Sequence, residues 1–165
     1  MRSLSLLFVA VVFVSVLGCQ DNVVFSDYKH FDEGWAGSDS LHFEFEAPDT
    51  IQPYHLFFNT RLNESYPFNN LYIITTVHFP NGKRIGDTLE YEMAYPNGEL
   101  MGEGFGSIKD SKLWFKSDIV FTESGRYTIK VQQAMRKMES IEPLDTLRGI
   151  MDFGLHIETN LKREN

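Results

Sequence analysis

The stretch LHFEFEA, residues 41–47, decides the class of fold because its apolar and polar side chains alternate without interruption. In an extended chain Leu41, Phe43 and Phe45 fall on one face, and the polar side chains between them fall on the other. A strand with one apolar face and one polar face is typical of an antiparallel sheet that covers a core. The proline at position 48 ends the pattern.

Seven further segments carry strand patterns and are separated by turn residues, including Pro80-Asn81-Gly82 and Pro96-Asn97-Gly98. The segments are 54–62, 71–79, 88–95, 100–108, 112–121, 126–135 and 150–158. None of them keeps a helical period. We therefore predict an all-β fold, an antiparallel β-sandwich of about eight strands. The pattern leaves an immunoglobulin-like and a jelly-roll-like topology open.

Length and composition bound the class of protein. A chain of 165 residues with 42% hydrophobic and 14% aromatic side chains suffices for one domain with a sizeable core. Its formal net charge of −8 disfavours nucleic-acid partners, which attract basic surfaces. The single cysteine excludes a disulfide framework within the chain.

The N-terminus has the pattern of an export signal. Arg2 is followed by an uncharged run from Leu4 to Leu17, which is shorter than the roughly 20 residues that a spanning helix needs. The next residues, Gly18 and Cys19, complete a segment that resembles the lipobox of bacterial lipoproteins. We expect residues 1–18 to be a signal peptide, residues 19–37 a lipidated N-terminus and tether, and residues 38–165 the β-sandwich domain.

The lipobox resemblance implies that Cys19 carries a diacylglyceryl group on its thiol and, after cleavage, an acyl chain such as palmitate on its amine. Two or more chains anchor a protein durably, whereas one is marginal. Gln20 rather than aspartate follows the cysteine. By the lipoprotein sorting rule this favours the inner leaflet of the outer membrane over the inner membrane, with the domain facing the periplasm.

The sequence offers no catalytic constellation. The five histidines are dispersed and lack a metal-ligand spacing, and there is no G-x-S-x-G elbow. The glycine-rich GEGFG at 102–106 lacks the spacing of a phosphate-binding loop. We interpret it as a bare strip against which backbone or a ring such as that of Trp114 packs. We predict no catalytic, cofactor or metal site, and no enzymatic activity.

One dense feature is a candidate contact surface. The stretch YPFNNLYI, residues 66–73, combines turn residues with aromatic and amide side chains that favour protein contacts. Turn chemistry alone accounts for most of this stretch. The alternative is a patch that Tyr66, Phe68, Asn69 and Asn70 present to a protein partner.

Four stretches together resemble the gliding motility lipoprotein GldH family: YPFNNLYI, GEGFGSIKD (102–110), the strand from Gly125 to Arg136, and LRGIMDFGLHIE (147–158). The resemblance covers nearly the whole chain after the lipobox. It implies a component of the gliding apparatus of Bacteroidetes, which is tied to a protein-secretion system of the same envelope. It brings no catalytic residue, only the lipidated cysteine, which matches Cys19.

Short D-[ST]-aliphatic stretches resemble O-glycosylation acceptors of that phylum, and Thr50 and Thr146 are the two candidates in expected loops. The sequence thus predicts a non-enzymatic envelope lipoprotein of the gliding machinery that contacts other envelope proteins of the gliding and secretion apparatus. The alternative is a lipoprotein that binds or processes carbohydrate on exposed aromatic rings. Buried tryptophans would count against that alternative.

Overall fold

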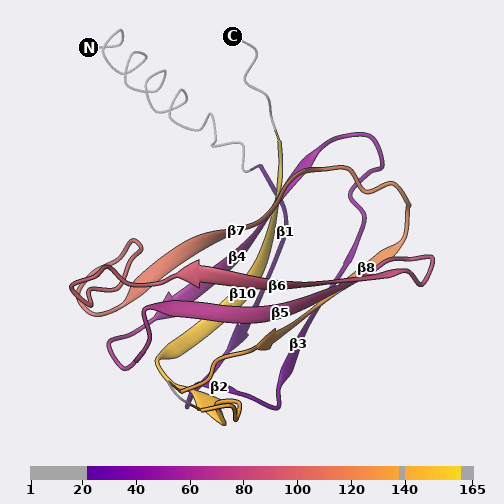
Figure 1. Cartoon of the computed structure of the whole chain (residues 1–165). Helices are drawn as coiled ribbons and strands as arrows, with labels where there is room; N and C mark the ends of the chain where they lie inside the picture. Colours follow the sequence, from indigo (N-terminus) through magenta and orange to yellow (C-terminus); the bar gives the residue numbers. More distant parts are fainter. Residues whose placement is uncertain (1–21, 138–139, 161–165) are drawn as a thin grey trace, which may run out of the picture.

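The computed structural model describes residues 22–137 and 140–160, and every regular element in these ranges is a β-strand (Figure 1). Ten strands are present there, of which β2 and β9 have two residues each. Their bounds are β1 Val23–His30, β2 Trp35–Ala36, β3 Ser40–Glu46, β4 Tyr54–Leu62, β5 Asn70–His78, β6 Arg84–Glu92, β7 Lys109–Ile119, β8 Arg126–Gln133, β9 Thr146–Leu147 and β10 Ile150–Thr159.

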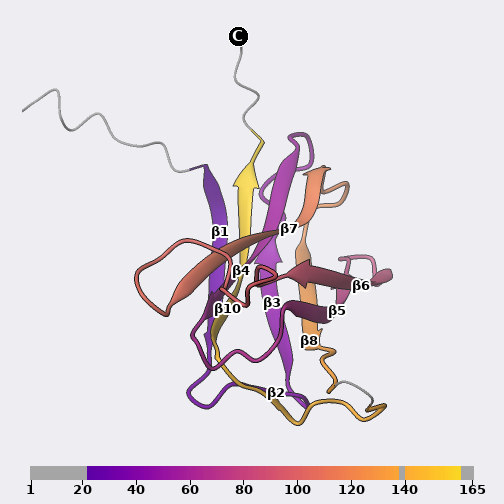
Figure 2. The same ribbon diagram turned by 60° about the vertical axis from the view of Figure 1, so that its left-hand side comes forward.

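The eight longer strands form two antiparallel sheets that face each other (Figure 2). One sheet has the order β1-β10-β4-β7, the other β3-β8-β5-β6, and β2 pairs with β9 beside them. If the eight long strands are counted along the chain, the orders are 1-8-3-6 and 2-7-4-5. This is the jelly-roll arrangement of two Greek keys. The predicted β-sandwich is confirmed, and the strand order selects the jelly-roll-like topology over the immunoglobulin-like one.

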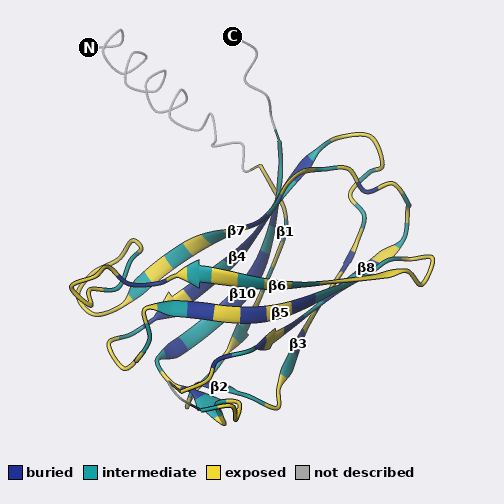
Figure 3. Ribbon diagram, viewed as in Figure 1, coloured by how far each residue is buried: buried dark blue, intermediate teal, exposed yellow. Residues whose placement is uncertain are grey.

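The core lies between the two sheets and is rich in aromatic rings (Figure 3). β3 follows the period of two that its sequence predicts, with Leu41, Phe43 and Phe45 buried and the residues between them exposed. Across the core, Phe153 of β10 lies 6.3 Å from Phe43 and 5.0 Å from Trp35, measured between ring centroids. These offset contacts stabilise aromatic pairs beyond the area that they bury.

The expected tether over residues 19–37 is wrong for Val23–His30, which form the edge strand β1 and pair with β10. Phe25 explains the pairing, because its ring lies 5.3 Å from Phe45 across the sandwich. Trp35, also in the expected tether, is fully buried. The other inward positions of β1 hold polar side chains, so the sequence of this strand has the composition of a linker.

The expected strand at 100–108 is also wrong. In the structure this segment carries only isolated bridges, from Leu100 to Ala94 and from Glu103 to Asp110. Gly102, Gly104 and Gly106 have φ values of 114°, 144° and 63°, which are incompatible with a regular strand. The two predicted turns are confirmed, since the glycines of both Pro-Asn-Gly stretches have positive φ.

The sandwich has two ends, which we call proximal and distal. At the proximal end the chain enters at Asn22 and leaves at Asn160, beside loops 47–53 and 120–125 (Figure 2, top). There the Thr159 amide donates to the Asn22 carbonyl at 2.8 Å. The distal end carries loops 63–69 and 134–149, and loop 93–108 projects beside them (Figure 1, left).

Candidate functional site

The two stretches that stand out in the sequence, YPFNN and GEGFG, meet at the distal end. The Asn69 carbonyl accepts hydrogen bonds from the amides of Met93 and Ala94, at 2.7 and 3.1 Å, at the base of loop 93–108. A groove of about 490 Å³ runs between the two stretches, lined on one side by residues 64–69 and on the other by residues 98–109. Their joint position defines what we call the distal surface: residues 64–69, 98–109 and 140–148.

The four predicted contact residues differ in how far their side chains are exposed to solvent. Tyr66 is buried, its hydroxyl donates to the Asn70 carbonyl at 2.7 Å, and burial raises the pKa of that phenol. Asn70 begins β5, and its amide donates to Glu90 at 2.8 Å. Asn69 is exposed and Phe68 is half-buried. Tyr66 therefore stabilises the loop rather than offering its ring to a partner.

Phe68 and the preceding Pro67 form a ridge between two grooves. Both residues line the groove toward loop 93–108, and both line a second groove of about 780 Å³ toward loop 134–149. Each of the two loops across these grooves carries one strongly exposed apolar side chain: Phe105 is 98% exposed in loop 93–108, and Ile141 is 82% exposed in loop 134–149. Exposed aromatic and aliphatic groups beside grooves are characteristic of protein interfaces.

The GEGFG loop holds Phe105 out by close backbone packing. A Cβ on Gly102 would lie 2.4 Å from the Asp110 carbonyl oxygen, and one on Gly104 would lie 2.4 Å from that of Ile108. Glu103 and Asp110 exchange both backbone hydrogen bonds, at 2.8 and 2.7 Å. The expected close approach of backbone is found at Gly102 and Gly104, but Gly106 has open space around it and the segment is not extended. The expected bare strip of three glycines on one strand face is therefore wrong, and Trp114 is not among the atoms nearest to these glycines. The sequence signal for Phe105 was its position between glycines, which have no side chain to cover it.

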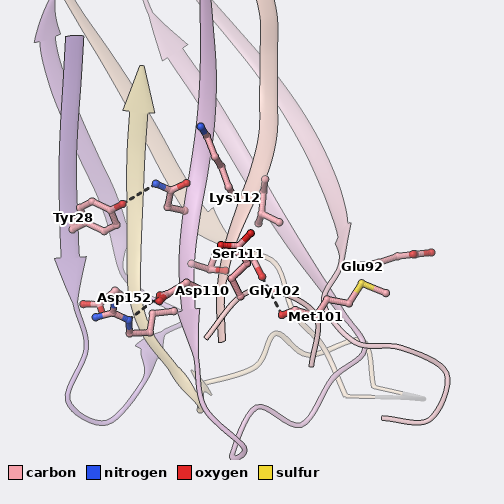
Figure 4. A pocket seen from close by; sticks show the side chains of 13 residues that line it. Tyr28, Glu92, Met101, Gly102, Asp110, Ser111, Lys112 and Asp152 are labelled. Atoms are coloured by element: carbon pink, nitrogen blue, oxygen red, sulfur yellow. Dashed lines mark hydrogen bonds and ion pairs between the residues drawn. The ribbon is translucent and has the colours of Figure 1, made fainter. Parts of the chain in front are cut away.

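A third groove, of about 800 Å³, lies on the outer face of the sheet β1-β10-β4-β7 (Figure 4). Arg61 stands there between Asp110, at 2.8 Å, and Asp152, at 3.6 Å. The hydrogen bond that Arg61 donates to Asp110 raises the pKa of Arg61, and the hydrogen bond between the His30 ring and the Asp152 carboxylate raises the pKa of His30. Arg61 is thus paired with two carboxylates of the groove, and Lys112 pairs with Glu158 of β10 at 2.6 Å. Glu92 and Glu103 also line the groove, and they make no ion pair with the described residues.

The carbohydrate alternative predicts paired carboxylates beside exposed, coplanar aromatic rings. Asp110 and Asp152 of this groove both contact Arg61. Trp35 is fully buried, and the ring of the exposed Trp114 lies at 50° to that of Phe57 rather than coplanar with it. Among the described residues, no group of three or more His, Cys, Asp or Glu side chains is arranged to hold a metal ion.

The remaining predicted site residues lie elsewhere. Thr50 is exposed in loop 47–53, whereas Thr146 is half-buried in β9, so Thr50 is the more accessible of the two glycosylation candidates. The signal peptide and Cys19 lie outside the described residues. In the part of the chain that the structure describes, no helix has the length and apolar character to cross a membrane.

Comparison with known proteins assigns the family. The family model described as GldH lipoprotein matches residues 23–157. The chain is 44% identical to a gliding motility lipoprotein GldH homolog of Christiangramia forsetii, over 85% of this chain and 86% of that protein. It is 40% identical to the gliding motility lipoprotein GldH of Flavobacterium johnsoniae, over 88% of this chain and 90% of that protein.

Among solved structures, the VP2 subviral particle of infectious bursal disease virus matches with a TM-score of 0.40 and 11% identity. That match covers 81% of this chain and 32% of the viral chain. Its TM-score is too low to add evidence on the fold to what the strand order gives. The family model spans the sandwich from the edge strand β1 into β10, and the two relatives each cover more than four-fifths of the chain. The chain belongs to the GldH lipoprotein family.

Proposed function

We propose that this protein is a lipid-anchored component of the gliding motility machinery that acts through protein contacts rather than catalysis. The observation that carries the proposal is the match of residues 23–157 to the GldH lipoprotein family. Relatives that bear the gliding motility name cover the same sandwich at 40% and 44% identity. The lack of a recognisable nucleophile or metal-ligand motif in the sequence supports a role without catalysis.

The anchor is Cys19, and the domain faces the periplasm. The lipobox ends at this cysteine, and a lipoprotein family is consistent with acylation there. Gln20 after the cysteine supports the inner leaflet of the outer membrane rather than the inner membrane. The partners are other envelope proteins of the gliding and secretion apparatus.

The partner-binding region is the distal surface, with the Pro67–Phe68 ridge at its centre and Phe105 beside it. Full burial of a phenylalanine side chain contributes about 1.5–3 kcal/mol, so the 98% exposure of Phe105 leaves that free energy available to an interface. Asn69 adds an exposed amide next to the ridge. A few buried aromatic anchors commonly carry most of the affinity of an interface.

Deletion of the gene and complementation test the role and the anchor. Cells without the gene should not spread on agar or glide on glass, and the wild-type chain should restore both. Cys19→Ala should leave the protein unacylated by intact mass and should not restore gliding. Normal gliding in the deletion strain would contradict the assigned role. Gliding restored by unacylated Cys19→Ala protein would contradict the anchor alone.

Site-specific photo-crosslinking tests the distal surface in intact cells. A photoreactive phenylalanine analogue at position 105 should crosslink to another envelope component that gliding requires. The matched control is the same analogue at Ile85, a 44% exposed residue of β6 away from the distal surface. Phe105→Ser should abolish gliding at unchanged protein level, whereas Ile85→Ser should not. Equal crosslinking at both positions, or gliding by Phe105→Ser, would argue against this surface.

A further inference from the structure

An exposed isoleucine marks the opposite, proximal end of the sandwich. Ile51 is 83% exposed in loop 47–53, between β3 and β4. The loop is held by Asp49, whose carboxylate accepts the amides of Ile51 and Gln52, each at 2.7 Å, and the hydroxyl of Tyr54. Because one side chain satisfies three donors, the turn is fixed and Ile51 cannot fold back onto the core.

This loop lies directly beside the point where the chain enters the domain. The Thr159 amide donates to the Asn22 carbonyl at 2.8 Å, and the next amide, of Asn160, donates to the Pro53 carbonyl at 3.0 Å. The loop and the first described residue are therefore joined through the last residue of β10 and the residue that follows it. Further apolar side chains are exposed at this end: Val23 at 38%, Val24 at 41% and Val120 at 42%.

The distance to the anchor is limited by the chain itself. Only Gln20 and Asp21 separate Cys19 from Asn22. Three peptide units span at most about 11 Å even when fully extended. An acylated cysteine sits at the boundary between acyl chains and headgroups, so this short connection holds the proximal end at the membrane surface.

We propose that the Ile51 loop rests in the headgroup layer of the bilayer that holds the Cys19 acyl chains, and so sets the orientation of the domain. The proposal rests on the anchor proposed above. A lipid surface covers this apolar end, because the short connection to Cys19 leaves no room for a folded partner between the domain and the bilayer. β1 has eight residues, so the distal surface then stands about 25 Å further from the membrane.

The charge of this end indicates which lipids it tolerates. Asp49 and Asp118 lie beside the apolar side chains, and Asp118 accepts a hydrogen bond from Asn160. Acidic groups are repelled by anionic headgroups over a Debye length of about 10 Å. Contact should therefore be stronger on vesicles of phosphatidylcholine than on vesicles with one-fifth phosphatidylglycerol.

Fluorescent labelling of the full lipidated protein in vesicles tests the contact. Cys19 is the only natural cysteine and its thiol is acylated in this protein, so a new cysteine at Ile51 reacts alone with an environment-sensitive dye. The matched control is Ile141→Cys, because Ile141 is 82% exposed at the distal end. In phosphatidylcholine vesicles with spin-labelled headgroups, we expect at least twofold greater quenching at position 51 than at 141, together with a blue shift.

The outcomes separate the two proposals. Intact mass without acyl chains overturns the anchor and, with it, this orientation. Acylated protein with equal quenching at 51 and 141 overturns the orientation alone. A dye at position 51 that is not quenched in vesicles but is shielded in intact envelopes would identify a protein neighbour. That result would also overturn the proposed orientation. The intact-mass measurement also detects a glycan on Thr50, which would hold Ile51 away from the lipid.

A second variant tests the contact of Ile51 itself. With the dye on Val120→Cys instead, Ile51→Glu should reduce the quenching.

Discussion

The steric role of Gly154 gives the sharpest test of the outer sheet face. Gly154 lies in β10 opposite Tyr28 of β1, and the Tyr28 ring covers it. A Cβ built on Gly154 would lie 2.5 Å from Cδ1 and 2.6 Å from Cε1 of that ring. The Tyr28 hydroxyl also accepts a hydrogen bond from the Asn59 amide at 2.7 Å. Gly154→Ala must therefore displace the ring and strain this hydrogen bond.

The expected magnitude follows from opposing contributions. Overpacking costs about 1–3 kcal/mol. The strained hydrogen bond adds little, because it is exposed and water replaces what it loses. Alanine in place of glycine in a strand returns about 0.5–1 kcal/mol through the unfolded state. Gly154→Ala should thus lower the free energy of unfolding by about 1–2 kcal/mol. In a Tyr28→Ala background the clash is gone, and Gly154→Ala should raise the free energy of unfolding by about 0.5–1 kcal/mol.

Urea unfolding of the domain with all four combinations measures the coupling, which should be about 2 kcal/mol. Tyr28→Phe is the control, because it removes the hydroxyl but keeps the ring, so Gly154→Ala should remain destabilising beside it. The midpoints should change at constant slope. An equal effect of Gly154→Ala in the wild-type and Tyr28→Ala backgrounds would refute the reasoning.

Two further predictions concern the loops at the two ends. Gly149→Ala should destabilise by at least about 3 kcal/mol, because φ is +78° and the new Cβ would lie 2.1 Å from the Tyr66 backbone nitrogen. The control Gly98→Ala has φ +85° but open space around it and should cost about 1–2 kcal/mol; equal urea midpoints for both variants would refute the clash. At the proximal end, the hydrogen bonds from Tyr54 and then from two backbone amides lower the pKa of Asp49 in the folded state. Its stabilising effect should be present above the unfolded pKa of about 3.9 and be lost as pH falls. Asp49→Asn should accordingly flatten the decline of the urea midpoint between about pH 5 and 3, and an unchanged decline would contradict this.

The number of long strands agrees with the sequence prediction, but one member of the set differs. Residues 100–108 are predicted as one of the strands, yet the glycines take positive φ there. Val23–His30 has the composition of a linker and is the true eighth long strand. A single apolar residue such as Phe25 does not predict a strand from the sequence. Its role as an inward-facing residue of an edge strand becomes visible only in the tertiary structure, where its ring packs against Phe45.

The candidate contact surface was recoverable only in part. Turn chemistry identified YPFNN and GEGFG separately, because proline, asparagine and glycine have strong local preferences. Nothing local indicates that Tyr66 turns inward to bond Asn70 or that Asn69 fixes the base of loop 93–108. The contact of Asn69 joins segments that are distant in the sequence, and it leaves no periodic signal in either one.

The sequence by itself determined the all-β class, most strand positions and the two Pro-Asn-Gly turns, because alternation and turn preferences are local properties of the chain. Only the tertiary structure decided the jelly-roll order, the place of β1 at a sheet edge and the opposite positions of Ile51 and the distal surface. Strand order depends on which apolar faces pack best across long loops, and several orders satisfy the same alternation. The direction in which the domain presents its surfaces follows from that order.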